Sequence, residues 1–148
     1  MTDTTPTESN LSGLDRKDFQ KNINSRKTDL YILKNAQGME VAVTNYGCAI
    51  LSIMVPDKNG KFANVILGHD SIEHVINSPE PFLSTTIGRY GNRIANGKFT
   101  LYGEEHLLTV NNGPNSLHGG PTGFHARVWD AVQPNESTVI FNYTSADG

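Results

Sequence analysis

Apolar and polar residues alternate along much of the chain after residue 29. Residues 40–46 alternate between apolar and polar side chains, and an apolar run over 49–55 ends in a Pro- and Gly-containing turn at 56–60. A period of two places successive side chains on opposite faces of a strand, so these segments predict β-strands. Residues 30–33 predict a strand before them, and residues 64–67 predict a short one after them.

The second half of the chain continues this pattern. Residues 98–110 predict a hairpin, with Phe99 and Leu101 on one face and Gly103 and Glu104 as a two-residue type II′ loop. Two more strands are predicted at 127–133 and 138–144, joined by a turn at residues 134–135. No helical pattern long enough for a βαβ crossover separates these strands. The pattern therefore predicts an antiparallel all-β fold.

Two short helices interrupt the strands. Asp15 can cap the first, with Leu14 and Phe19 at staple positions, and Ser71 can cap one or two turns over residues 71–77. Residues 1–12 are mostly Thr, Ser, Asp and Asn, with almost no apolar side chain to bury. We expect them to form a disordered tail or linker.

Composition narrows the classes of function. The chain of 148 residues has a net charge of −3 and a pI of about 5.9, without a run of like charges, which argues against nucleic acid or an anionic membrane as a partner. No apolar stretch approaches the ~20 residues of a spanning helix, and no signal peptide is visible. The single cysteine, Cys48, excludes an internal disulfide framework and a cysteine-based zinc cluster.

The glycine-punctuated segment 88–96 is the first candidate site. Arg89 and Arg93 lie four residues apart, with Asn92 and Asn96 among them. Guanidinium and amide groups hold sugar hydroxyls or carboxylates in fixed geometry. Gly, Asn and Arg are equally typical of an exposed turn with solvated charges, so the chemistry of this segment alone leaves both interpretations open.

The second candidate segment, 111–120, contains His118 between Leu117 and a glycine pair. A loop imidazole can donate or accept a proton at neutral pH, and flanking glycines let the backbone approach a ligand. A lone loop histidine is more often structural or merely exposed. Because the hairpin over 98–110 can bring its two ends together, we expect Arg93 and His118 to face one shallow cleft. His69 and His74 do not have a common metal-ligand spacing, so no metal site is predicted.

The two segments together resemble a known family. The run IGRYGNRIANGKFTLYGEEHLLTVNNGPNSLHGG, residues 87–120, resembles the signature region of the aldose 1-epimerase (galactose mutarotase) family. Residues 43–68 and the run GFHARVW at 123–129 are similar to it too, although the family more often has an acidic residue where His125 stands. The resemblance covers about residues 28–148. It implies a large antiparallel β-sandwich of the galactose mutarotase type, with residues 1–25 as polar tail and short helix and 26–148 as the N-terminal part of the sandwich.

The resemblance also implies a chemistry. Asn92 and Arg93 match the family's Asn-Arg pair, which binds sugar hydroxyls, and His118 matches a histidine that contacts the sugar and assists near the reacting centre. The family interconverts the α and β anomers of hexoses such as galactose and glucose. An acid protonates the ring oxygen while a base removes the C1 hydroxyl proton, and the ring opens and recloses on the other face. This implies a small-molecule sugar as partner, no cofactor or metal, and a monomer or weak dimer.

In the family the proton-donating histidine and the glutamate base lie well downstream of the segment that contains His118. Residues 143–148 resemble the beginning of a further family motif. We therefore expect an N-terminal fragment of an epimerase that is inactive by itself. A non-catalytic sugar-binding β-sandwich is one alternative, and a hexose-phosphate epimerase relative is another, with Arg89 as the spare cation. The cysteine content suits the cytoplasm, whereas residues 1–12 would also suit a periplasmic or exported protein whose leader is absent from this chain.

Overall fold

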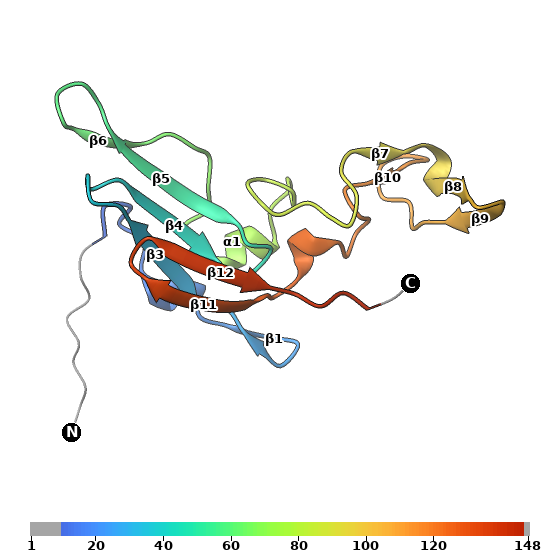
Figure 1. Cartoon of the computed structure of the whole chain (residues 1–148), viewed down its shortest axis with the longest axis horizontal. Coiled ribbons are helices and arrows are strands. Elements are labelled where there is room, and N and C mark those ends of the chain that lie inside the picture. The colour runs from blue at the N-terminus through green and yellow to red at the C-terminus, as the bar shows by residue number, and fades with distance from the viewer. Residues whose placement is uncertain (1–9, 147–148) are drawn as a thin grey trace.

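The computed structural model describes residues 10–146, and most of its regular secondary structure is antiparallel strand, with only short helical turns besides (Figure 1). A four-stranded sheet in the order β3–β4–β5–β6 forms its centre. The strands of this sheet are β3 (Leu30–Lys34), β4 (Glu40–Thr44), β5 (Ile50–Pro56) and β6 (Phe62–Asn64). Each neighbouring pair is antiparallel, which confirms the predicted all-β class.

The remaining strands form two-stranded antiparallel pairs. They are β1 (Asn22–Ile23) with β2 (Arg26–Lys27), β7 (Arg93–Ile94) with β10 (Ser116–Leu117), β8 (Lys98–Leu101) with β9 (Glu104–Leu107), and β11 (Asp130–Asn135) with β12 (Thr138–Asn142). The β11–β12 hairpin lies beside β3 (Figure 1). Lys34 N–H donates to the Glu136 carbonyl at 2.7 Å, and the rings of Tyr31 and Phe141 meet edge to face at 5.9 Å.

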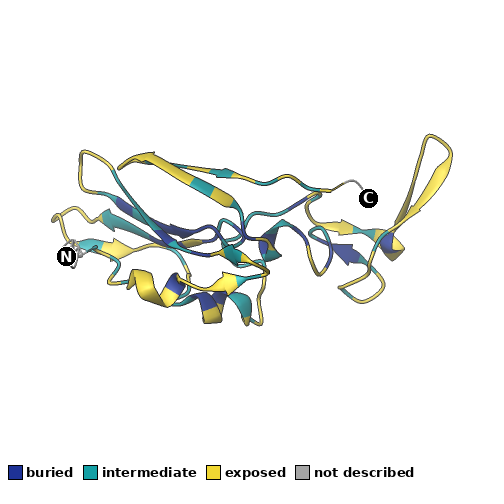
Figure 2. Ribbon diagram, turned by 90° about the horizontal axis from the view of Figure 1, so that it is seen from below, coloured by how far each residue is buried: buried dark blue, intermediate teal, exposed yellow. Residues whose placement is uncertain are grey.

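The core lies between the four-stranded sheet and two short helices. These are the 3₁₀ helix η1 (Arg16–Phe19) and the α-helix α1 (Ile72–Ile76), which lie on the same side of the sheet (Figure 2). Both begin at the predicted caps, because the side chains of Asp15 and Ser71 accept backbone N–H groups of the first turn. The buried cluster consists of Phe19, Leu30, Ala42, Ala49, Leu51, Ile72 and Val75.

A third 3₁₀ turn, η3 (Phe124–Ala126), lies between β10 and β11, and η2 (Ala95–Gly97) lies between β7 and β8. The β7–β10 pair and the β8–β9 hairpin extend away from the central sheet (Figure 1). All eight residues of β8 and β9 are exposed. The extension therefore depends on the contacts at its base, where the two candidate segments lie.

The segment before η1 is bound to the sheet by Glu40. The Glu40 side chain is fully buried, and its carboxylate accepts the backbone N–H groups of Leu11 at 2.9 Å and Ser12 at 3.0 Å. The predicted disordered tail is therefore wrong for residues 10–12, since a buried carboxylate on β4 offers acceptors that composition does not reveal. Residues 1–9 of that prediction lie outside the described residues.

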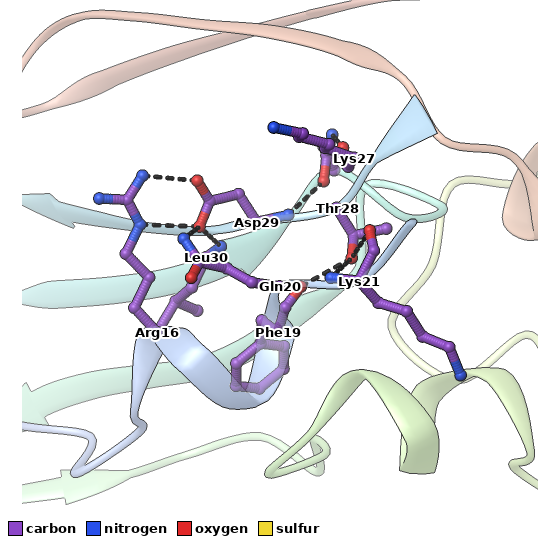
Figure 3. Close-up of polar contacts among 9 residues, drawn as sticks. Arg16, Phe19, Gln20, Lys21, Lys27, Thr28, Asp29 and Leu30 are labelled. Atoms are coloured by element: carbon purple, nitrogen blue, oxygen red, sulfur yellow. Dashed lines mark hydrogen bonds and ion pairs between the residues drawn. The ribbon is translucent and has the colours of Figure 1, made fainter. Parts of the chain in front are cut away.

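The β1–β2 hairpin was not predicted. Its turn residues, Asn24 and Ser25, have φ of 49° and 65°, which matches a type I′ turn. The Thr28 hydroxyl behind it donates to the Phe19 carbonyl at 2.7 Å (Figure 3). A pocket of about 330 Å³ lies here, lined by Gln20, Lys21, Asn22, Lys27, Thr28 and Asp29, and none of the candidate site residues lines it.

Three turn or strand predictions are shifted in the structure. Leu101 pairs with Glu104, so the loop is a type I′ turn at Tyr102 and Gly103, both with positive φ, rather than type II′ one residue later. Strand β6 lies at 62–64 rather than 64–67. Asn135 pairs with Thr138, which moves the last turn from residues 134–135 to 136–137.

Candidate functional site

The two glycine-punctuated segments are joined directly. Strand β7 pairs with β10, so that Arg93 lies opposite Leu117, and the His118 N–H donates to the Asn92 carbonyl at 3.0 Å. The β8–β9 hairpin occupies the chain between them (Figure 1). The structure thus brings Asn92, Arg93 and His118 together, as the hairpin prediction required. The shallow cleft between them stays a prediction.

The imidazole of His118 has a defined orientation. Asn92 N–H donates to His118 Nδ1 at 3.0 Å, so Nδ1 is the acceptor and the neutral ring carries its proton on Nε2. Within residues 10–146, Nε2 has no hydrogen-bond partner, which leaves this donor available to a ligand. Asn92 and His118 both have left-handed backbones, with φ of 58° and 53°. The Asn92 backbone therefore bonds both the backbone N–H and the side chain of His118, and the Asn92 side chain stays available to Arg93.

The guanidinium of Arg93 is held by two amide oxygens. Its Nε donates to Asn112 Oδ1 at 2.9 Å, and its Nη1 donates to Asn92 Oδ1 at 3.0 Å. Arg93 is exposed and makes no ion pair with the part of the chain that is described. An arginine presents five donors in a rigid fork. Within residues 10–146 Nη2 makes no hydrogen bond, so it can bind hydroxyl oxygens while the other two bonds fix its direction.

Asparagines 111 and 112 shape the loop before β10. The Asn111 side chain accepts the Leu117 N–H at 2.7 Å and donates to the Leu117 carbonyl at 3.1 Å. Ser116 Oγ donates to the Thr109 carbonyl and therefore accepts from the Tyr90 hydroxyl. Sequence reasoning singled out neither Asn111 nor Asn112, although the dense asparagines of this segment were a signal that side-chain amides replace ladder bonds here.

Glycines allow the segments to cross at the base of the site. The Gly88 carbonyl accepts the Phe124 N–H at 3.1 Å, and a Cβ on Gly119 would lie 1.9 Å from the Gly88 oxygen. Gly119 also has a φ of +86°. The first glycine after His118 is thus required by packing against residue 88, in addition to the ligand access expected from the sequence.

An aromatic column lies behind His118. The Phe82 ring contacts the His118 ring, with centroids 4.8 Å apart, and the His125 ring, with centroids 4.5 Å apart. His125 is 5% exposed, and its buried Nδ1 has no partner within the described residues. Burial lowers the pKa of His125, and His118 and Arg127 lower it further. Sequence reasoning left His125 undetermined and had no signal for Phe82.

The buried His125 predicts a pH-dependent stability. Unfolded His125 takes up a proton near pH 6.5, and the folded form does so only at lower pH, so acidification below 6.5 favours unfolding until the folded residue is also protonated. In His125→Phe, the free energy of unfolding should fall less between about pH 7.5 and pH 5.5 than in the unchanged chain. Urea unfolding at both pH values measures the change in the free energy of unfolding for the variant and for the unchanged chain. An equal change in the two proteins would contradict the prediction.

The other arginine of the first candidate segment, Arg89, bonds to the C-terminal part of the described chain. Arg89 donates to Ser145 Oγ at 2.7 Å and to the Ala146 carbonyl. Across residues 10–146, no three His, Cys, Asp or Glu side chains are grouped to hold a metal ion. No helix in that same range is long and apolar enough to cross a membrane.

Comparison with known proteins identifies a family. The family model described as aldose 1-epimerase matches residues 29–148. The galactose mutarotase of Bos taurus is 40% identical over 110 residues, which are 74% of this chain and 32% of that protein. The aldose 1-epimerase of Escherichia coli K12 is 40% identical over 119 residues, covering 80% of this chain and 34% of its own. The chain thus spans about one third of the length of these relatives.

Solved structures agree on the fold. The GalM/aldose epimerase homologue from C. elegans superposes with a TM-score of 0.72 at 33% identity, covering 77% of this chain and 35% of that one. The galactose 1-epimerase from Lactobacillus acidophilus gives 0.64 at 31% identity, covering 76% and 32%. The antiparallel architecture is therefore of the galactose mutarotase type.

Proposed function

We propose, because this chain belongs to the aldose 1-epimerase family, that residues 88–120 form the sugar-hydroxyl-binding part of an aldose 1-epimerase site. The observation that carries the proposal is the reciprocal pair between Asn92 and His118, with Arg93 fixed beside it. This arrangement presents the Nε2–H of His118 and the free Nη2 of Arg93 as donors. Sugars offer hydroxyl and ring oxygens that such donors recognise.

The reaction proposed for the whole protein is anomer exchange of a hexose such as galactose or glucose. A base takes the C1 hydroxyl proton and an acid gives a proton to the ring oxygen, so the C1–O5 bond breaks without net proton change and reforms on the other face. His118 assists by hydrogen bonding near the reacting centre, and Asn92 and Arg93 orient the sugar.

The proposed reaction needs a general acid and a general base, and the group formed by Asn92, Arg93 and His118 does not supply both. No carboxylate within residues 10–146 hydrogen-bonds to Asn92, Arg93 or His118. We propose that a glutamate base and a second histidine complete the site in the whole protein. These two residues would lie in the region that corresponds to the unmatched part of the relatives. The sugar partner and a monomeric or weakly dimeric state belong to the same proposal, as does the cytoplasmic location.

The 148-residue chain alone should therefore show no mutarotation above the buffer-catalysed rate. A chimaera in which this chain replaces the matching third of the E. coli aldose 1-epimerase should regain enzyme-like turnover, because the missing acid and base are then present. Polarimetry of fresh α-galactose against a matched buffer blank measures both. Turnover by the chain alone would contradict the need for further residues.

The main alternative, a non-catalytic sugar-binding domain, gives a different result in the same experiment. The chimaera would bind galactose, seen as shifts of the Asn92 and His118 NMR signals, without accelerating mutarotation. Loss of both binding and turnover in a folded chimaera would overturn the proposed site as well as the activity.

A further inference from the structure

Within the described residues, the His118 side chain makes a single hydrogen bond. The hydrogen bond from Asn92 N–H fixes Nδ1 and leaves the ring free to tilt about that atom. The Phe82 ring lies against the imidazole at an interplanar angle of 63°, an edge-to-face contact that blocks such a tilt. Together the two contacts define both the position and the plane of the imidazole.

Phe82 is itself held from behind. The buried His125 ring lies on it at 60° and 4.5 Å, and the backbone of His125 packs on Gly47, where a Cβ would come within 2.3 Å of the His125 oxygen. The Gly47 N–H donates to the Arg127 carbonyl at 2.7 Å. The column His125–Phe82–His118 therefore connects the turn between β4 and β5 to the candidate site.

We infer that Phe82 is a positioning residue, which holds the His118 ring in the one orientation that presents Nε2–H to the sugar. This inference rests on the proposed function for its role in the reaction. Its structural part, a single tautomer and a fixed ring plane for His118, can be measured without any sugar.

The first test uses the 148-residue chain with ¹⁵N-labelled histidine. Long-range ¹H–¹⁵N spectra near neutral pH should show His118 as a single Nε2–H tautomer, shifted by the Phe82 ring current. Phe82→Leu should remove the ring-current shift and let the ring tilt away from Asn92 N–H, which weakens the hydrogen bond to Nδ1 and lets the tautomers average. Phe82→Tyr should keep both the shift and the single tautomer. Tautomer averaging in the unchanged chain would overturn the inference even if a variant failed to fold.

The chain contains a matched control. Phe99 stacks on His106 at 5.0 Å in the exposed β8–β9 hairpin, outside the column. Phe99→Leu should change the His106 signals and leave those of His118 in place, while Phe82→Leu should do the reverse. A change of His118 signals in both variants would mean a general loosening and would overturn the specific role of Phe82.

The second test separates this inference from the proposed function. In the chimaera, Phe82→Leu should lower kcat about tenfold with KM changed less than about twofold, and Phe82→Tyr should restore kcat. A raised KM at unchanged kcat would mean that Phe82 binds sugar directly, which overturns the positioning role. If the NMR result holds and the unchanged chimaera is inactive, the proposed function fails while the orientation of His118 by Phe82 stands.

Discussion

Replacing His118 by alanine in the chimaera is expected to lower kcat/KM for α-galactose mutarotation by a factor of about 10² or more. The Nε2–H of His118 is oriented by Asn92 and has no other partner within residues 10–146, so its hydrogen bond to the sugar is lost without replacement. Polarimetry at several sugar concentrations gives kcat and KM separately.

Arg93→Ala should act partly through KM, because a hydroxyl contact serves the ground state and the transition state alike.

His106 provides the control for this experiment. It is an exposed histidine on β9, stacked on Phe99 and remote from the Asn92–His118 pair. His106→Ala should leave kcat/KM unchanged within about twofold. A similar small change in His118→Ala would remove His118 from the site.

Gly119→Ala is expected to destabilise the chain by about 3 kcal/mol or more. Its Cβ would lie 1.9 Å from the Gly88 oxygen, a backbone atom, and its φ of +86° is unfavourable for alanine. Since the crossing of Gly88 and Gly119 holds the base of the site, the Asn92–His118 hydrogen bonds should be lost as well. Urea unfolding measures the stability, and the His118 NMR signals report the site.

Gly103→Ala separates the clash from the backbone strain. Gly103 has nearly the same φ, +84°, but nothing lies within 4 Å of the Cβ it would carry. This variant should cost only about 1–2 kcal/mol, the penalty of a left-handed alanine. Equal losses for the two variants would show that packing on Gly88 contributes nothing.

Much of the fold follows from local patterns in the sequence. Alternation marked the strands near β3 and β4, an apolar run marked β5, and side-chain caps marked both helices at Asp15 and Ser71. Errors of one to three residues arose at turns, as at Tyr102, because a left-handed non-glycine residue is hard to foresee. The bound segment at 10–12 was missed because its partner, Glu40, is distant in sequence.

The candidate site was found only as two separate segments. Arg93 and His118 carried recognisable chemistry, and the hairpin between them indicated that they meet. The pairing of β7 with β10 and the contact of His118 with Phe82 depend on tertiary packing, which has no periodic signal. Likewise, the burial of His125 follows from its packing near Gly47, on a distant turn.

The β8–β9 hairpin also has a consequence for how the site assembles. Bringing Arg93 and His118 together costs the entropy of closing the loop between them, and that cost grows with the length of flexible chain. The hairpin is a local contact that forms within microseconds, and once Lys98 is paired with Leu107 the free part of the loop is much shorter. The exposed hairpin thus lowers the entropy cost of bringing the two site segments together, although none of its own residues belongs to the candidate site.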